Sequence, residues 1–250
     1  MKQFTFILLL CLATGTALAQ NDYTKSLEGI EWVRIESKAD ITVRTHSKNE
    51  LLIKVGSSVA TPDRAKGLKL VGEGGTDNTD VGFYVVQDGN NLIVKSLRKS
   101  EDAEIFLPAT QNFSVKSTWH GDIEIEGFTS EIEANAQLNG GIVIREVTGP
   151  ITANALNGEI EVQFKTVKQD SPISIYTTNG EVDVSLPQGT PADLFLSSLN
   201  GEIYTNFDLK RPDKDGLKSI STRRVTGSIN NGGVSIKLKS TNGNIYLRKK

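Results

Sequence analysis

Apolar and polar residues alternate along most of the chain, and the alternation restarts after glycines. Gly158 is followed by Glu159, Ile160, Glu161 and Val162, so that every second side chain is apolar. A period of two predicts β-strands that bury one face and expose the other. The same pattern begins at six other glycines: Gly121, Gly140, Gly180, Gly201, Gly232 and Gly243. The chain is therefore expected to be all-β and built from repeats.

Each repeat holds a second strand before its glycine, and a turn-forming residue joins the two strands. Ile173 to Ile175 is one such strand, upstream of Gly180. Asparagine before glycine supplies the positive φ of a corner, which β-branched residues adopt only at a cost. His120 takes the place of the asparagine in the first repeat. The asparagines that directly precede a repeat glycine include Asn139, Asn157, Asn179, Asn200 and Asn242. One unit is thus strand, corner, strand and second corner, in about twenty residues.

Two architectures agree with this unit. Asn-Gly could close two-residue hairpins and give an antiparallel β-meander or sandwich. Alternatively, each unit is one coil of a β-solenoid, or β-helix, with coils stacked about 4.8 Å apart. We favour the solenoid, because stacked coils would align the five asparagines in a hydrogen-bonded ladder. It predicts near-complete burial of Ile123, Ile125, Ile142, Ile144, Ile160, Val162, Val182, Val184, Ile203 and Ile245.

Residues 20–102 follow the repeat less regularly than residues 103–250. Short apolar runs such as Leu51 to Val55 still indicate strands, and Thr61-Pro62-Asp63 predicts a short helix that ends at Gly67. No proline- or serine-rich linker divides the two parts. We therefore expect residues 20–250 to form a single elongated domain.

Residues 1–19 have the features of a secretory signal peptide. Lys2 is followed by a short apolar run, and Ala17-Leu18-Ala19 is typical of a cleavage site. The run is too short to span a membrane, and a lipoprotein signal would need a small residue in place of Leu10 before Cys11. We expect an exported protein, periplasmic, on the cell surface or extracellular, whose mature chain has no transmembrane segment and, without Cys11, no thiol.

Composition narrows the class of protein, and charge is unevenly distributed. The 250 residues are 37% hydrophobic and 23% charged, with a formal net charge of −2, which excludes a disordered chain. Residues 206–250 are basic, whereas residues 20–205 are acidic. The interval between Gly201 and Gly232 exceeds one coil, so its excess should project as a loop. The basic residues proposed for polyanion binding are Lys210, Arg211, Lys214, Lys218, Arg223 and Arg224. The alternative is an ordinary solvated face.

The end of the chain resembles the bacterial putative-adhesin domain family, a secreted domain of unknown function. The resemblance lies in the stretch from Thr226 to Leu247 and in the Leu-Pro and Asn-Gly-Glu-Ile pattern at residues 186–203. It covers about residues 39–248. It implies a right-handed β-solenoid and export, and it brings no catalytic residues.

The sequence contains no recognisable catalytic or cofactor motif. His46 and His120 lie far apart without a third zinc ligand at a suitable spacing. The chain also lacks a nucleophile elbow, a P-loop and a dinucleotide fingerprint. We therefore expect no catalytic residue, no cofactor and no metal.

Outward-facing carboxylates are the one group of residues that could still form an active site or a metal site. If the coils stack, Asp122, Glu124, Glu126, Glu159, Glu161, Glu181, Asp183 and Glu202 form an acidic stripe. Rows about 4.8 Å apart would suit a retaining glycosidase or calcium binding. The alternative is a charged solvent face that prevents edge association. A second calcium candidate is the set Asp77, Asp80 and Asp88.

Exposed aromatic residues offer a route to sugar binding. Tyr204 and Tyr246 have outward parity, and Trp119 and Tyr176 lie just before corners. Their rings could stack on sugars, or they could merely pack on strands. Taken together, we expect a non-enzymatic β-solenoid, an adhesin or envelope scaffold, that presents a repetitive surface to a glycan or protein and not to nucleic acid. The alternative is a carbohydrate-active enzyme that uses the acidic stripe.

Overall fold

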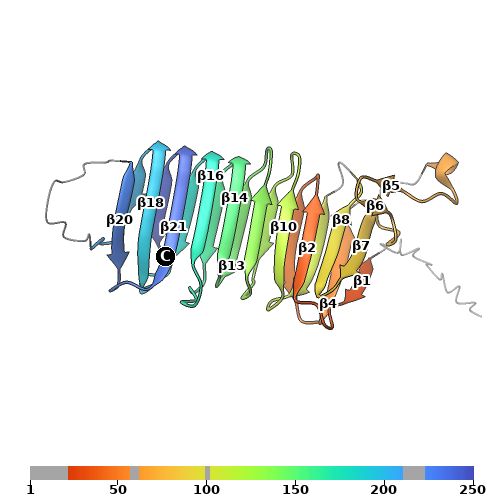
Figure 1. The fold of residues 1–250 in the computed structure, drawn as a ribbon, viewed down its shortest axis with the longest axis horizontal. Helices are drawn as coiled ribbons and strands as arrows, with labels where there is room; N and C mark the ends of the chain where they lie inside the picture. Colours follow the sequence, from red (N-terminus) through yellow and green to blue (C-terminus); the bar gives the residue numbers. More distant parts are fainter. Residues whose placement is uncertain (1–21, 57–61, 99–101, 211–222) are drawn as a thin grey trace, which may run out of the picture.

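The computed structural model describes residues 22–56, 62–98, 102–210 and 223–250. The expected signal peptide, residues 1–19, lies outside the described residues. Within them the protein is all-β (Figure 1), and the only helix is the 3-10 turn Asp63–Ala65, where the sequence predicts a short helix. No helix of the described chain is long and apolar enough to cross a membrane.

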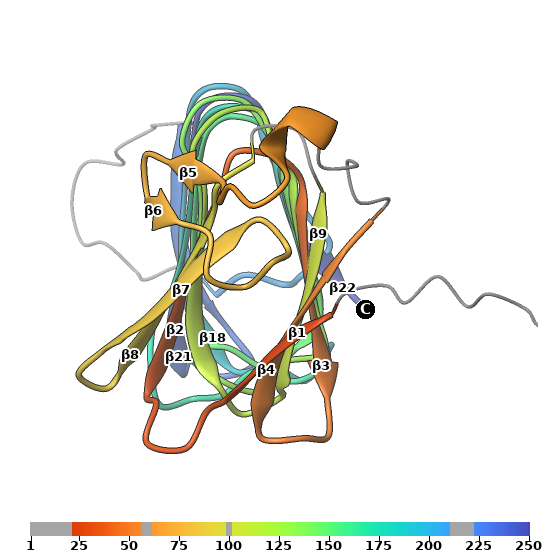
Figure 2. The same ribbon diagram turned by 90° about the vertical axis from the view of Figure 1, so that its right-hand side faces the viewer.

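Two ten-stranded sheets face each other along the length of the molecule (Figure 2). Sheet A has the order β1 (Tyr23–Ser26), β4 (Glu50–Val55), β9 (Ala103–Pro108), β3 (Ile41–His46), β11 (Ile123–Glu126), β13 (Ile142–Val147), β15 (Ile160–Phe164), β17 (Val182–Leu186), β22 (Ile245–Lys249) and β19 (Ile203–Thr205). Sheet B has the order β20 (Arg224–Ile229), β18 (Ala192–Asn200), β21 (Val234–Asn242), β16 (Ile173–Asn179), β14 (Ile151–Asn157), β12 (Ile132–Ala136), β10 (Asn112–Ser117), β2 (Trp32–Ser37), β8 (Asn91–Ser96) and β7 (Phe83–Asp88). A third sheet has two strands, β5 (Val71–Gly72) and β6 (Gly75–Thr76), and contacts β7 of sheet B.

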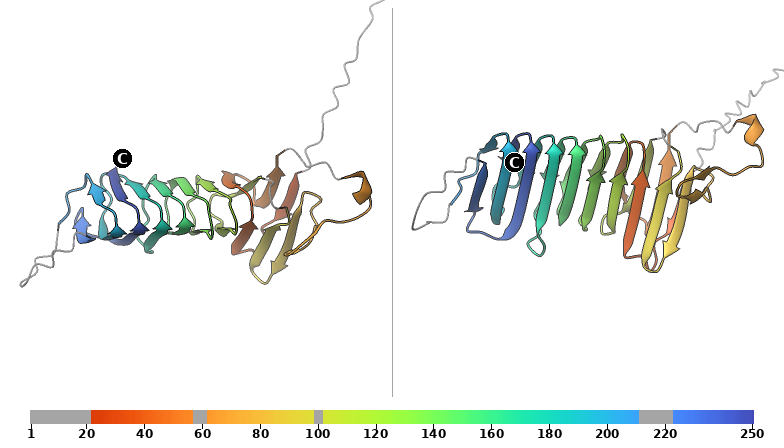
Figure 3. Two further views of the ribbon diagram at one scale, coloured as in Figure 1. Left: turned by 90° about the horizontal axis from the view of Figure 1, so that it is seen from above. Right: turned by 45° about the horizontal axis from the view of Figure 1, so that its top comes forward.

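Most neighbouring strands are parallel, so the antiparallel meander is wrong for the body of the molecule. Among the described strands, antiparallel pairs occur toward the ends, between β1 and β4, β4 and β9, β7 and β8, and β18 and β20, and in the small sheet. In the middle, Ile123 pairs with Ile142, which pairs with Ile160. A strand of sheet B followed by a strand of sheet A forms one layer of the stack, which we call a rung (Figure 3).

The inward side chains of both sheets form one hydrophobic core. The residues that alternation predicts to be buried are at most 2% exposed, with one exception. Ile203 is only partly buried, because β19 lies at the edge of sheet A and has a neighbour on one side only. Burial at a period of two therefore follows from the sequence pattern along the whole stack.

The rungs do not stack strictly in chain order. From β10 to β17 each rung lies on the one before it, as the repeats predict. At the C-terminal end, however, β21 and β22 lie between the rung of β16 and β17 and the rung of β18 and β19 (Figure 1). At the other end, β2 and β3 lie between the rung of β8 and β9 and the rung of β10 and β11. Both terminal rungs are thus inserted one place inward.

Close stacking at the corners requires glycine there. A Cβ atom on Gly158 would lie 2.0 Å from the carbonyl oxygen of Gly140, and one on Gly243 would lie 1.9 Å from that of Gly180. Gly158 is not in the left-handed region, and neither are the asparagines of the ladder or His120. The expectation that Asn-Gly supplies a positive φ is therefore wrong for the ladder asparagines and for Gly158, but it is confirmed at Gly140, Gly180 and Gly243, whose φ angles are 149°, 159° and 155°. At Gly158 glycine is required because the backbone of the neighbouring rung leaves no room for a Cβ atom.

Candidate functional site

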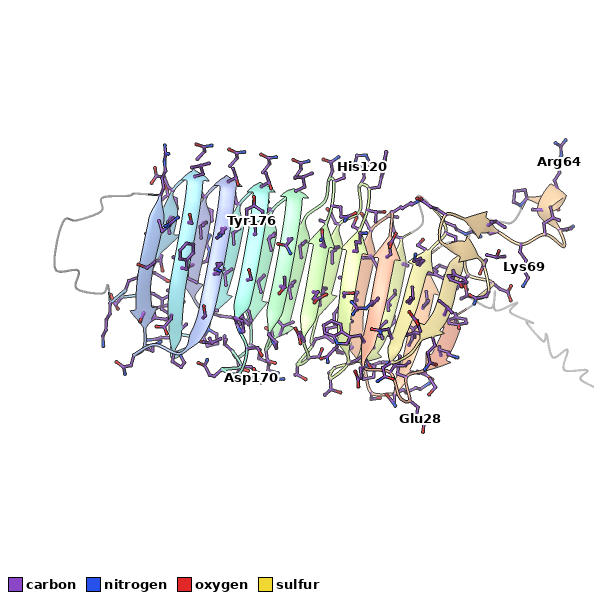
Figure 4. The ribbon with its side chains drawn as sticks, viewed as in Figure 1. Glu28, Arg64, Lys69, His120, Asp170 and Tyr176 are labelled. Carbon is purple, nitrogen blue, oxygen red and sulfur yellow. The ribbon has the colours of Figure 1, made fainter. Side chains whose placement is uncertain are left out.

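The asparagines at the corners lie in one line of side-chain hydrogen bonds, on the edge of the stack where Figure 4 labels His120. Asn157 Nδ2 donates to Asn139 Oδ1 (3.3 Å), and Asn179 Nδ2 donates to Asn157 Oδ1 (2.7 Å). Asn242 Nδ2 then donates to Asn179 Oδ1 (2.6 Å), and Asn200 Nδ2 donates to Asn242 Oδ1 (2.8 Å). Chain order would place Asn200 next to Asn179, but the inserted C-terminal rung places Asn242 between them.

His120 continues this line at its other end. Its Nδ1 lies 3.0 Å from Asn139 Nδ2. His46 lies elsewhere, and its Nε2 is 2.7 Å from the backbone oxygen of Glu50. Each histidine is thus placed in a local structural contact, and the two do not meet.

Buried hydroxyl groups reinforce the same corners from inside, which the sequence analysis missed. Thr177 Oγ1 donates to the carbonyl oxygen of Gly158, Ser240 Oγ to that of Gly180, and Ser198 Oγ to that of Gly243, each at 2.8 Å. A serine or threonine at an inward strand position, three residues before the glycine, is the signal that could have revealed them.

The acidic stripe is broken into separate groups. Glu124 is separated from Glu161 by Val143 on β13, and Asn244 lies between Glu181 and Glu202. Asp122 and Glu124 line a depression of about 370 Å³ with Asp40, Asp102, Glu104 and Lys54, near the N-terminal end of sheet A. What remains together is a set of four carboxylates on the adjacent strands β15 and β17 or just before them: Glu159, Glu161, Glu181 and Asp183.

Three of these four carboxylates have donors of their own. Arg248 makes three hydrogen bonds to Asp183, from Nε to Oδ1 (2.8 Å), from Nε to Oδ2 (3.0 Å) and from Nη2 to Oδ2 (2.7 Å). Gln163 Nε2 donates to Glu161 Oε1 (2.7 Å). Asn244 Nδ2 donates to Glu181 Oε1 (3.0 Å), which also accepts from the Tyr246 hydroxyl (3.3 Å).

Glu159 differs from the other three. Partial burial, together with the charges of Glu181, Asp183 and Glu161, holds the pKa of Glu159 above its usual value. A carboxyl group whose charged form is disfavoured in this way keeps its proton to a higher pH than a free glutamic acid does.

Two tyrosines extend the carboxylate set toward the edge of sheet A. Tyr204 and Tyr246 are paired in register, and their rings stack with centroids 5.3 Å apart and planes 11° from parallel. Tyr204 is 52% exposed, and the Arg248 guanidinium lies 5.1 Å from the centre of the Tyr246 ring. We call Tyr204, Tyr246, Asn244, Glu181 and Glu159 the tyrosine–carboxylate face. Exposed ring faces beside amide and carboxylate groups can stack on a sugar ring and bind its hydroxyls.

The calcium interpretations find no support in the described residues. Within them, no group of three or more histidine, cysteine or acidic side chains is arranged to hold a metal ion. Asp77 instead accepts backbone N–H groups from Thr79 (2.9 Å), Asp80 (3.0 Å) and Gly82 (3.0 Å), so it holds a turn. Asp88 ends β7 and is far along the strand from that turn.

The six basic residues proposed for polyanion binding are only partly described. Arg211, Lys214 and Lys218 lie outside the described residues. Lys210 donates to Asn231 Oδ1 (3.0 Å), and Arg223 is exposed just before β20. Arg224 begins β20 and lies over the ring of Phe195, 5.3 Å from its centre. The structure therefore brings Arg224 together with a strand that the sequence analysis did not associate with it.

Comparison with known proteins adds a family and a resemblance of fold. The family profile described as Toastrack DUF4097 matches residues 82–248, more than half of the chain. Among solved structures, a putative cell adhesion protein from Clostridium sporogenes ATCC 15579 is similar, with 10% identity and a TM-score of 0.45 over 92% of this chain and 99% of that chain. A putative adhesin from Bacteroides fragilis NCTC 9343 is similar with 12% identity and a TM-score of 0.47, over 92% of this chain and 96% of that chain. None of the curated proteins matches the chain.

Proposed function

The chain belongs to the Toastrack DUF4097 family, and from this premise we propose that it is an exported, adhesin-like protein that binds a glycan at the cell envelope without catalysis. The proposal includes export through residues 1–19 and a single elongated domain over residues 20–250. It also takes the fold to be a right-handed β-solenoid with coils of about twenty residues. In such a protein the rungs hold a flat surface rigid, and outward side chains provide the binding groups.

The observation that carries the proposal is the stacked pair Tyr204 and Tyr246 on the tyrosine–carboxylate face. The two rings lie on neighbouring strands, so the sheet fixes their spacing before any ligand arrives. Preorganised aromatic groups lose little conformational entropy on binding. Asn244 and Glu181 beside them supply amide and carboxylate groups for sugar hydroxyls. Rigid rings with polar groups at one side favour a saccharide as the ligand.

The test is a glycan array probed with the purified protein and with variants. The double variant Tyr204→Ala and Tyr246→Ala should bind its glycan about tenfold more weakly, because two stacking surfaces are lost. Trp119→Ala is the matched control, since Trp119 is also exposed (58%) but lies at a corner away from this face. Equal binding by wild type and the double variant, or binding to no glycan on the array, would contradict the proposal.

One observation favours an enzyme as the second candidate. Glu159 has a raised pKa, and Glu181 and Asp183 lie on or just before the neighbouring strand β17. Glycosidases use two carboxyl groups, one of which has its pKa raised so that it can act as a general acid. Against it, Arg248 occupies both oxygens of Asp183. Release of reducing ends from a bound polysaccharide, abolished in Glu159→Gln, would establish the enzyme; binding without release supports the adhesin-like role.

A further inference from the structure

A second cluster of chemically distinctive side chains lies on the outer face of sheet B, the face turned to the viewer in Figure 4. The ring of Phe195 on β18 is surrounded by three cations from the strands on either side. Arg224 of β20 lies 5.3 Å from the ring centre, Lys237 of β21 lies 5.9 Å from it, and Lys239 of β21 lies 5.6 Å from it. We call these four residues the Phe195 patch.

The three cations of the Phe195 patch have no carboxylate partner in the part of the chain that the structure describes. Their neighbours in register are uncharged: Lys237 stands opposite Ser174, and Lys239 stands between Tyr176 and Ser197. On the other face, by contrast, Arg248 and Arg145 are paired with Asp183 and Glu161. Unneutralised positive charges held close together attract anions.

One carboxylate does lie on the same strand as Phe195. Asp193 is two residues away, and one of its oxygens accepts a short hydrogen bond from Ser228 Oγ (2.6 Å). Asp193 is therefore hydrogen-bonded to β20, and within the described residues it forms no ion pair with the three cations of the patch. The patch keeps its positive charge.

The sheet fixes the spacing of these cations. Lys237 and Lys239 are two residues apart on one strand, which is about 7 Å, and β20 and β21 flank β18, which places them about 10 Å apart. The ring holds the cations over its face, so less side-chain freedom is lost when an anion arrives. Charges spread over this distance on a flat face suit several anionic groups along one extended polymer better than a single small anion.

A depression beside the patch indicates what kind of polymer. It has a volume of about 540 Å³ and is lined by Asp193, Leu194, Lys210, Thr226, Gly227, Ser228 and Asn231. Thr226 stands in register with Phe195, so the depression adjoins the patch. Hydroxyl and amide groups beside cations suit an acidic saccharide, whose hydroxyls need partners as well as its charges. The apolar surface of the patch is one ring, which is little for insertion into a lipid surface.

We propose that the Phe195 patch is a binding site for acidic polysaccharide, that is, a chain of sugars that carry carboxylate or sulfate groups. It is separate from the tyrosine–carboxylate face, which lies on the other sheet and is acidic. It also differs from the site predicted from sequence, since of those six residues only Arg224 belongs to it. This inference goes beyond the proposed function, because either face can fail without the other.

The experiment measures binding of the purified protein to immobilised heparin, a sulfated polysaccharide, and to polygalacturonate, a carboxylated one. The triple variant Arg224→Gln, Lys237→Gln and Lys239→Gln should bind about tenfold to thirtyfold more weakly. Binding by wild type should fall steeply between low and physiological salt, because exposed charges are screened over about 8–10 Å. The two polymers show whether sulfate or carboxylate is preferred.

A matched control removes the same charge elsewhere. Lys25, Arg64 and Lys69 are exposed and lie at the opposite end of the molecule, where Figure 4 labels Arg64 and Lys69. Their triple change to Gln should leave heparin and polygalacturonate binding unchanged. Lys237→Arg, which keeps the charge, should also bind as wild type does, and equal melting temperatures show that the variants are folded.

Three outcomes would overturn the proposal. One is equal binding by wild type and the patch variant, and another is an equal loss in the Lys25, Arg64 and Lys69 control, which would reflect net charge alone. The third is tighter binding to single-stranded DNA or to phosphatidylserine vesicles than to either polysaccharide. The double tyrosine variant should bind both acidic polymers normally, so failure of this site and failure of the proposed function are told apart.

Discussion

Replacing Gly158 by Ala tests whether close backbone stacking holds the corners together. The new Cβ would lie 2.0 Å from the Gly140 carbonyl oxygen, whereas ordinary contacts begin at 3.4 Å. The obstacle is a backbone atom of the rung below and not the end of a flexible side chain. The two rungs must therefore separate locally by more than 1 Å to admit a methyl group.

The expected loss of stability follows from what such a separation breaks. The hydrogen bonds that cross between these two rungs include Gly140 N to Asn157 O (3.2 Å), Ile142 N to Glu159 O (2.9 Å) and Asn157 Nδ2 to Leu138 O (2.8 Å). Loss of one or two of these bonds costs about 1 kcal/mol each, and overpacking adds about 1–3 kcal/mol. We expect a loss of about 3 kcal/mol, which lowers the melting temperature of a chain of this size by about 6–12 °C.

Thermal unfolding followed by circular dichroism provides the measurement. Gly189→Ala is the control, because Gly189 has no atom within 4 Å of the added Cβ and no left-handed φ, and it should melt within about 2 °C of wild type. Gly158→Asn separates the two explanations for the glycine. A requirement for left-handed backbone would make Asn milder than Ala, whereas a steric requirement makes it at least as harmful. Wild-type melting of Gly158→Ala, or rescue by Asn, would refute the reasoning.

Two further changes test the ladder and the tyrosine–carboxylate face. Asn157→Val removes a side chain that donates to Leu138 O (2.8 Å) and accepts from Asn179 (2.7 Å), so it should destabilise the protein by about 1 kcal/mol or more in denaturant melts; Asn154→Val on the same strand is the control, and an equal effect of both would argue against the ladder. Because the pKa of Glu159 is raised above 4.5, its contribution to stability is present below that pH and is lost as the pH rises through the raised pKa. Glu159→Gln should therefore raise the melting temperature relative to wild type at pH 7 but not at about pH 4. Glu202→Gln is the control and should not show this difference. An equal shift for Glu159→Gln at both pH values would contradict the assignment.

Alternation along the chain was enough to predict the strands of the repeats, the core and the residues of the ladder, but not β20 or the small sheet of β5 and β6. Ile160 and Val162 are buried because alternate residues of a strand point to the same face, and this face is the apolar one. The asparagines align because every rung turns at the same position, as Asn157 and Asn179 show. The role of the glycine after them was predicted only in part. Gly140, Gly180 and Gly243 do have a positive φ, but the crowding that requires Gly158 is a property of the stack and not of one corner.

The order of the rungs could not be predicted from the same pattern. Every repeat has an apolar inner face and a corner of the same kind, so any repeat could stack on any other. The repeat pattern does not indicate which two repeats become neighbours. Asn200 and Asn242 are equivalent by sequence, yet Asn242 is the one next to Asn179. Which strands pair when they are distant in sequence depends on the whole fold. Here the chain passes through β18, β19 and β20 before the last rung packs against β16 and β17.

The last rung contributes side chains to both candidate binding faces. In sheet A it places β22 beside β19, which stacks Tyr246 on Tyr204, and beside β17, which brings Arg248 to Asp183. In sheet B it places β21 beside β18, which brings Lys237 and Lys239 to Phe195. Stacking in chain order would separate Arg248 from Asp183, because β19 would then lie between β17 and β22, whereas β22 would still adjoin β19 and β21 would still adjoin β18. The residues of β21 and β22 thus supply groups to both surfaces, with their inward positions in the core and their outward positions free to specify a ligand. Folding of the C-terminal rung and assembly of both faces are therefore one event, and a ligand on either face stabilises the position of that rung.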